Sequence, residues 1–223
     1  EKHYVRTFTK VTGRNVRISE IFNVPLTAQE EQAVIDKIQH DPNFKAVLIK
    51  EDVLREALMN NQGRAKFVLN EDAGIIPKAY RGLSVSLGSS VGALMKDEDP
   101  IDWKSLSEKK IVRVNPTGYL LIKVRGHYLL TFNQGALNEG ELLLSPPGGG
   151  YWFADKDGRQ LYYQHMALSR SLDRNEPLSM RRIISGRDLG LFVTMFNSTQ
   201  GREIVPYREL VQELVGPQSE TGG

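Results

Sequence analysis

The sequence has 223 residues, of which 40% are hydrophobic, and it contains no cysteine. A chain of this length can bury a core without disulfide or metal staples. The lack of cysteine excludes a disulfide framework, a cysteine-ligated zinc site and a thiol nucleophile, and it fits a cytoplasmic location. The 29 basic residues nearly balance the 27 acidic ones, which argues against a nucleic-acid polymer as the main ligand. No apolar run approaches the roughly 18 residues of a membrane span, so we expect no membrane segment.

The first half of the chain predicts a mixed α/β unit. Thr27 and Glu30 form a capping-box pattern that opens a helix to about Gln39. Two helices followed by a strand also occur in DNA-binding modules, so a protein-interaction or DNA-binding module centred on this half is the alternative function. The other elements predicted here are strands over 4–11, 44–49 and 65–69 and helices over 51–60 and 103–106.

A boundary is expected near residue 105. The acidic stretch 96–102 contains a proline and breaks the apolar pattern before the short helix. We therefore divide the chain into an α/β domain of unknown role, 1–105, and a second domain, 106–223.

The second half predicts strands first and a helix later. A tight turn at 125–127 joins two of the strands as a hairpin. We also expect residues 151–153 to pair with 160–163 as a second hairpin across 155–158. The remaining elements predicted are strands over 111–114, 119–124, 128–132 and 142–144 and an amphipathic helix over 187–197.

The run from Gly201 to Gly216 predicts a helix that begins at Pro206. Its apolar residues recur at helical spacing, which leaves Glu209, Gln212 and Glu213 together on one flank. Oxygen ligands one helical turn apart suit Mg²⁺, which binds a few protein carboxylates and completes its shell with water and phosphate. The other interpretation is that these side chains only form the solvated face of an amphipathic helix.

The aromatic residues that follow the glycine-rich turn at 146–150 suggest two alternatives. Tyr151 lies among five aromatic residues that are able to stack on a nucleotide base. Alternation along paired strands would instead bury at least half of them in the core. The five residues are Tyr151, Trp152, Phe153, Tyr162 and Tyr163.

The order of a hairpin, a Pro-Gly-Gly turn and an Arg-Glu-Leu-x-x-Glu helix resembles a Nudix domain. About sixty residues separate Gly149 from Arg208, which is too many for the usual Nudix box. The nearer resemblance, over residues 111–215, is to the SMODS-associated Nudix family of bacterial anti-phage operons. Further residues close to that family's pattern are Arg182, Ile184 (one residue out of step), Gly186 and Leu189.

The resemblance implies an α+β fold in which a Nudix-like domain of mixed sheet and helix follows the first domain. It implies a nucleotide or nucleotide-derived signal as ligand, with Pro147, Gly148, Gly149 and Tyr151 as nucleotide-binding residues. It also implies Arg208, Glu209 and Glu213 as catalytic residues, and Glu209, Gln212 and Glu213 as metal ligands. The domain is then either a nucleotide-binding sensor or a weak Mg²⁺-dependent hydrolase of nucleoside diphosphate derivatives, in a cytoplasmic antiviral defence protein.

Three departures from the family pattern affect these expectations. Gln212 stands where the family often has a glutamate, and Gln200 occupies the position of an upstream glutamate, with Glu203 nearby but out of register. Each amide removes a negative charge, so we expect Mg²⁺ to bind weakly. The chain also ends soon after the helix, so the domain is expected to be C-terminally incomplete, and a further domain or a partner chain is expected to complete its sheet.

Overall fold

The structure is a computed structural model that describes residues 5–60, 65–88, 90–92, 103–166, 169–172 and 177–204. It combines a mixed sheet with several helices, which confirms the predicted fold class. The elements in chain order are β1 (Val5–Thr12), β2 (Asn15–Val24), α1 (Ala28–His40), β3 (Ala46–Lys50), α2 (Glu51–Met59), β4 (Lys66–Val68), η1 (Glu71–Ala73), β5 (Gly74–Ile75), η2 (Lys78–Tyr80), β6 (Ser84–Leu87), α4 (Trp103–Ser107), β7 (Val112–Val124), β8 (His127–Phe132), α5 (Gln134–Asn138), β9 (Leu143–Ser145), β10 (Gly148–Gly150), α6 (Lys156–Gln164), β11 (Ser169–Ser171), β12 (Arg182–Ile184), η3 (Gly186–Asp188) and α7 (Leu189–Asn197).

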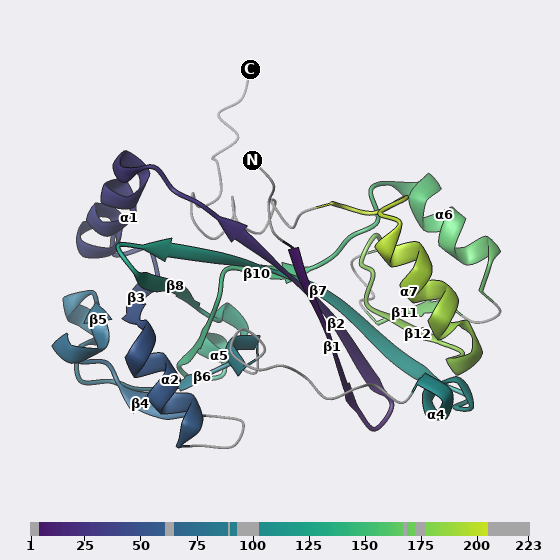
Figure 1. Ribbon diagram of the computed structural model, residues 1–223, viewed down its shortest axis with the longest axis horizontal. Helices are drawn as coiled ribbons and strands as arrows, with labels where there is room; N and C mark the ends of the chain where they lie inside the picture. The colour runs from purple at the N-terminus through teal and green to yellow at the C-terminus, as the bar shows by residue number, and fades with distance from the viewer. Residues whose placement is uncertain are drawn as a thin grey trace.

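The long strand β7 lies at the centre of the sheet (Figure 1). One of its edges pairs with β2 in parallel, in a register that places Val16 beside Val114. Its other edge pairs in turn with β12, β10 and β8, all antiparallel. β1 forms a hairpin with β2 and extends the sheet outward. β7 therefore connects strands from both halves of the chain.

The sequence divided β7 into two strands and did not predict β2. Pro116 lies inside this stretch, and proline is rare within strands. The structure shows one continuous strand from Val112 to Val124. The Pro116 carbonyl accepts a hydrogen bond from the Tyr151 N–H at 3.2 Å, and the Leu120 N–H donates to the Pro147 carbonyl at 2.8 Å. Neighbours on both edges thus hold the strand together across the proline.

The N-terminal hairpin extends the sheet of the second half, while its completion by a further domain or a partner chain stays a prediction. β1 and β2, from the first 24 residues, occupy the edge of β7 opposite β10 and β12. The sequence units 1–105 and 106–223 therefore share one sheet. A boundary near residue 105 between independently folding units stays a prediction.

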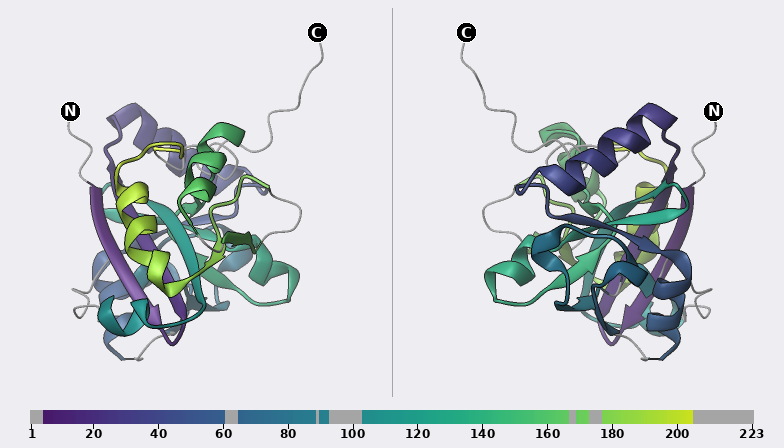
Figure 2. Two further views of the ribbon diagram at one scale, coloured as in Figure 1. Left: turned by 90° about the vertical axis from the view of Figure 1, so that its right-hand side faces the viewer. Right: turned by 90° about the vertical axis from the view of Figure 1, so that its left-hand side faces the viewer.

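Two large hydrophobic clusters form most of the core, and the larger one extends between both ends of the molecule. The larger cluster packs β2 and β7 against helices α1, α6 and α7. The smaller cluster packs α2 against β3, β6 and β8. Helices α6 and α7 lie at one end and α1 and α2 at the other (Figure 1), and Figure 2 views the molecule from each of these ends. None of the described helices is long and apolar enough to cross a membrane.

The sequence predicted the N-terminus of α1 correctly and missed that of α6. The capping box predicted at Thr27 is present: its hydroxyl accepts from the Glu30 N–H at 3.3 Å, and its own N–H donates to the Glu30 carboxylate at 2.8 Å. The hairpin predicted between 151–153 and 160–163 is wrong, because residues 156–164 form α6. Asp155 caps this helix by accepting from the Gly158 N–H at 2.7 Å, so the expected turn is a helix start.

Candidate functional site

The predicted site residues fall into two groups. Pro147, Gly148, Gly149 and Tyr151 lie in the described part of the chain. The second group, on the predicted metal-binding helix, lies outside the described residues: Arg208, Glu209, Gln212 and Glu213. The structure describes the glycine turn (147–150) and residues 201–204, which precede that helix in the sequence.

The glycine turn is pressed against the central strand. Gly148, Gly149 and Gly150 pair with Tyr119, Gly118 and Thr117 of β7. Gly148 has a φ of +144°, and a Cβ there would lie 2.1 Å from the Gly118 carbonyl oxygen. Only glycine fits this contact without a backbone shift. The turn is thus held by β7, while contact with a nucleotide stays a prediction.

Residues 201–203 run antiparallel beside residues 152–154, directly after the glycine turn. The Ala154 N–H donates to the Gly201 carbonyl, and the Glu203 N–H donates to the Trp152 carbonyl, both at 3.0 Å. Gly201 has a φ of +68° and lies so close to Gly158 of α6 that a Cβ on either residue would clash with the other's backbone. Residues 201–203, which precede the predicted metal-binding helix in the sequence, are therefore fixed beside residues 152–154.

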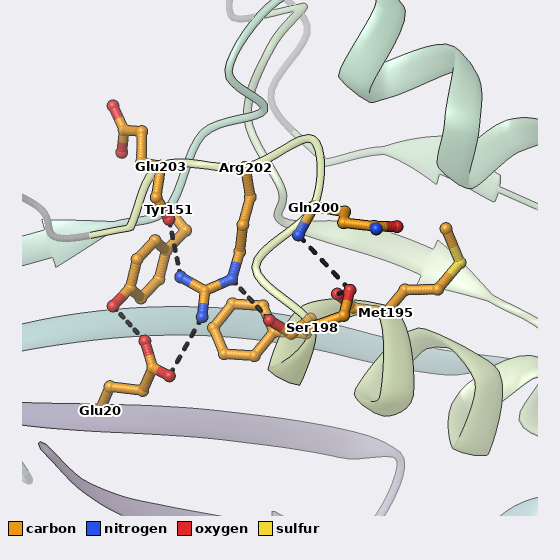
Figure 3. Close-up of polar contacts among 8 residues, drawn as sticks. Glu20, Tyr151, Met195, Ser198, Gln200, Arg202 and Glu203 are labelled. Atoms are coloured by element: carbon orange, nitrogen blue, oxygen red, sulfur yellow. Dashed lines mark hydrogen bonds and ion pairs between the residues drawn. The ribbon is translucent and has the colours of Figure 1, made fainter.

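A buried ion pair anchors this segment to the sheet (Figure 3). The Arg202 guanidinium lies 3.1 Å from the Glu20 carboxylate of β2, and both side chains are almost fully buried. Arg202 also donates to the carbonyls of Phe196 and Glu203, each at 2.7 Å. Its guanidinium carbon lies 4.6 Å from the centre of the Tyr151 ring and 3.9 Å from that of Phe196. Hydrogen bonds and aromatic faces together compensate for the buried charge.

Tyr151 belongs to the same buried cluster. Its hydroxyl donates to the Glu20 carboxylate, and its side chain has no exposed surface. Burial, followed by the nearby Glu20 charge, raises the pKa of Tyr151 well above the usual value. A neutral hydroxyl is therefore available as a donor at physiological pH. In this arrangement the ring packs against Phe196, so stacking on a nucleotide would require it to move.

The described residues do not gather a metal site by themselves. No group of three or more histidine, cysteine, aspartate or glutamate residues within the described ranges is placed to hold a metal ion. The Glu203 carboxylate instead accepts from the Trp152 N–H at 3.2 Å. Gln200 is exposed at the surface, and its N–H donates to the Ser198 hydroxyl at 3.4 Å. The predicted ligands Glu209, Gln212 and Glu213 lie outside the described residues, so the metal site stays a prediction.

A second buried arginine supports the neighbouring strand β12. The Arg182 side chain donates to the hydroxyls of Ser169 and Tyr163. Burial lowers the pKa of this guanidinium. The sequence pattern pointed to Arg182, Ile184, Gly186 and Leu189 as a strand-to-helix unit, and the structure forms it as β12, η3 and α7.

Sequence reasoning missed Glu20 and its role. The available signal was a glutamate on the inward side of an alternating strand, between the apolar residues Ile18 and Phe22. A charge at such a position needs a buried partner. The partner, Arg202, lies in the Gly-Arg-Glu run that sequence reasoning had singled out, but nothing local in the sequence connects the two.

Residues 111–220 match the family model of the SMODS-associated NUDIX domain. The match confirms the resemblance found in the sequence. It associates the C-terminal half of the chain, hereafter the NUDIX segment, with nucleotide-related binding or hydrolysis. No curated protein and no solved structure matches this chain.

The NUDIX segment contacts a buried side chain from outside the matched residues. Tyr151 and Arg202 lie within it, whereas their common partner Glu20 lies in β2, outside the matched residues. The N-terminal part of the chain thus contributes a side chain to the interior of the NUDIX segment.

Proposed function

We propose that the NUDIX segment binds a nucleotide or nucleotide-derived signal and hydrolyses it slowly or not at all. The observation that carries this proposal is the antiparallel contact between residues 201–203 and 152–154. It brings the chain entering the predicted metal-binding helix to the edge of the glycine turn. The Nudix resemblance requires the helix itself to lie beside this turn, and the contact made by residues 201–203 supports that expectation.

In the proposed site, Glu209 and Glu213 hold a weakly bound Mg²⁺ and Arg208 braces the helix. A Mg²⁺ held there would supply polarisation of a phosphoryl oxygen and activation of water. Gln212 and Gln200 contribute no negative charge, so affinity for the ion is reduced relative to an all-carboxylate site. This favours a sensor over an efficient hydrolase, in a cytoplasmic protein of bacterial antiviral defence.

The DNA-binding alternative finds little support in the helices of the first half. Helix α1 carries Glu30, Glu31 and Asp36 against one lysine, and α2 is similarly acidic. A recognition helix that approaches phosphates is normally basic. A protein-interaction role for this half is the remaining alternative.

The test is calorimetric titration of Mg²⁺ and of nucleoside diphosphate derivatives, together with a hydrolysis assay. We expect the wild-type protein to bind nucleotide with little turnover, and Gln212→Glu to raise both Mg²⁺ affinity and turnover. Gln160→Glu is the matched control, because it makes the same charge change on the exposed face of α6. Rapid Mg²⁺-dependent hydrolysis by the wild type, abolished by Glu213→Gln, would replace the sensor with an enzyme. Absence of any response to nucleotide or Mg²⁺ would favour the interaction module.

A further inference from the structure

A basic hollow of about 440 Å³ lies on the sheet formed by β1, β2 and β7. Leu172 and Arg181, from the segments beside β11 and β12, form a wall along one side, joined by a hydrogen bond from the Leu172 N–H to the Arg181 carbonyl at 3.0 Å. The lining residues are Lys10, Thr12, Asn15, Val16, Arg17, Arg113, Asn115, Leu172 and Arg181.

Strand register gathers the polar lining residues on one face. Lys10 pairs with Arg17, and Arg17 pairs with Asn115. In the adjacent row Thr12 pairs with Asn15, which in turn pairs with Arg113. Because side chains alternate along a strand, the residues between these point to the opposite face. Val16, Val114 and Ile18 are buried in the larger hydrophobic cluster.

The hollow concentrates positive charge. Four of its lining residues are cationic, and none of the described lining residues is acidic. Lys10 stands directly opposite Arg17, and like charges in such positions destabilise a strand pair. Lys10 and Arg113 are both exposed at the surface. An anion placed between the cations would turn this repulsion into attraction.

One polar atom that lines the hollow has no hydrogen-bond partner among the described residues. This atom is the buried side-chain oxygen of Asn115. A buried polar group without a partner is unfavourable. The Asn115 amide oxygen is able to accept from a ligand hydroxyl. In the flipped orientation, the amide NH2 group is able to donate to a phosphate oxygen.

The shape favours a small ligand over a polymer. The volume lies within the usual range of small-molecule sites, roughly 300–1,000 Å³. Three strand spacings separate Lys10 from the Arg181 side of the hollow, about 14 Å, so the cations are able to contact more than one anionic group. The net charge of only +2 gives no broad basic surface for a nucleic-acid strand.

We propose that this hollow binds a small ligand carrying two or more phosphate groups, without a divalent metal. Arginine supplies paired donors that fit phosphate oxygens, and lysine adds a point charge. The Arg181 side chain lies beside Gly150, where its Cδ is 3.7 Å from the position of a Cβ on that glycine. The hollow therefore adjoins the glycine turn, and its described lining residues are distinct from Pro147, Gly148, Gly149 and Tyr151.

The experiment measures binding of sodium triphosphate and of ATP by calorimetry, in low salt with EDTA. We expect both to bind, and we expect Arg113→Glu and Lys10→Glu each to weaken binding by about tenfold or more. Lys66→Glu is the matched control, because Lys66 is exposed on β4 in the other part of the sheet; it should change affinity less than about twofold. Arg113→Glu and Lys66→Glu should melt near the wild-type temperature, since they alter exposed side chains, and Lys10→Glu at or slightly above it, because it places opposite charges across the strand pair.

Several results would overturn the proposal. Failure of the wild type to bind triphosphate and ATP in EDTA is one, and an equal loss of affinity in Lys66→Glu is another. Tighter binding of a short single-stranded oligonucleotide than of ATP, lost in the same variants, would assign the hollow to a polymer instead. Lys10→Glu separates this hypothesis from the proposed function, because it should lose triphosphate binding in EDTA and keep the wild-type response to Mg²⁺.

Discussion

Arg202 and Glu20 lie 182 residues apart in the sequence, yet their side chains form a buried ion pair of 3.1 Å. The pair joins the segment before the predicted metal-binding helix to a strand from the start of the chain. Because the pair is buried, it is expected to have a large effect on the free energy of unfolding. Removing one partner leaves a charge that water does not reach.

We expect Arg202→Met to lower the free energy of unfolding by about 3–5 kcal/mol, the range for breaking a buried pair. Glu20→Gln combined with Arg202→Met should lower it by less than the sum of the two single changes, because no uncompensated charge remains. Urea unfolding followed by tryptophan fluorescence measures both. Lys123→Met, which removes the exposed pair with Glu51, is the control and should matter by less than about 1 kcal/mol. Strictly additive effects at Glu20 and Arg202 would contradict the coupling.

Two buried tyrosine hydroxyls should respond in opposite ways to removal. Tyr151→Phe takes a donor from the buried Glu20 carboxylate and should destabilise by about 1–3 kcal/mol. The Tyr162 hydroxyl is buried without a partner among the described residues, so Tyr162→Phe should be neutral or stabilising. Thermal melts of the two variants test the difference. The reverse order would show that Tyr162 has the more important hydrogen bond.

The same tyrosines predict a loss of stability in alkali. Burial raises the pKa of Tyr162 to about 12, and it also raises the pKa of Tyr151. In the unfolded chain a tyrosine releases its proton near pH 10, while the folded protein retains it. The stability is therefore fully present below pH 10 and falls as pH rises toward 12, by up to about 1.4 kcal/mol per unit for each tyrosine. Urea midpoints between pH 8 and 12 should show this decline, with a shallower slope in Tyr162→Phe.

Gly148 should be intolerant of any side chain. Gly148→Ala places a methyl group against the Gly118 carbonyl and forces an unfavourable φ, so we expect loss of at least about 2 kcal/mol. Gly190→Ala is the control, because Gly190 lies in α7 with open space around its Cα. Alanine there should be neutral or stabilise by up to about 1 kcal/mol. Equal melting temperatures for the two variants would indicate that β10 does not press on β7.

The NUDIX segment should depend on the N-terminal hairpin. A fragment of residues 106–223 would lack β2, and with it the partner strand along most of β7. We expect this fragment to show no cooperative unfolding by circular dichroism, whereas the full chain does. Addition of a peptide of residues 1–26 should restore part of the structure. Cooperative melting of the fragment alone would support the boundary at residue 105 as a true domain limit.

Local signals in the sequence predicted much of the fold. The capping box at Thr27 placed α1, and apolar spacing placed α7. These features depend on interactions within a few residues. β2 was missed because Ser19, Glu20 and Ile21 interrupt its alternation, and all three are buried. Their burial results from contacts with residues far along the chain, such as Thr117 and Arg202.

The candidate site was predicted only in part, for the same physical reason. The sequence pointed to the glycine turn, and the structure explains Gly148 by its contact with β7. Tyr151 was considered for nucleotide stacking because its aromatic neighbours suggested a binding surface. Tyr151 is buried with its hydroxyl bonded to Glu20. The basic hollow forms because the register of β1, β2 and β7 brings its lining residues together. Such register is not encoded in short sequence motifs.

The parallel pairing of β2 with β7 has a consequence for how the protein is made. Ser19 and Thr117, whose hydroxyls meet at 3.1 Å in the folded sheet, are separated by 98 residues. At a synthesis rate of roughly 5–20 residues per second, the N-terminal hairpin waits about 5–20 s for its partner strand to emerge from the ribosome. During that interval the edge of β2 has no partner strand, and an open strand edge is prone to pairing with other chains. The nascent chain is therefore open to such pairing until β7 has emerged.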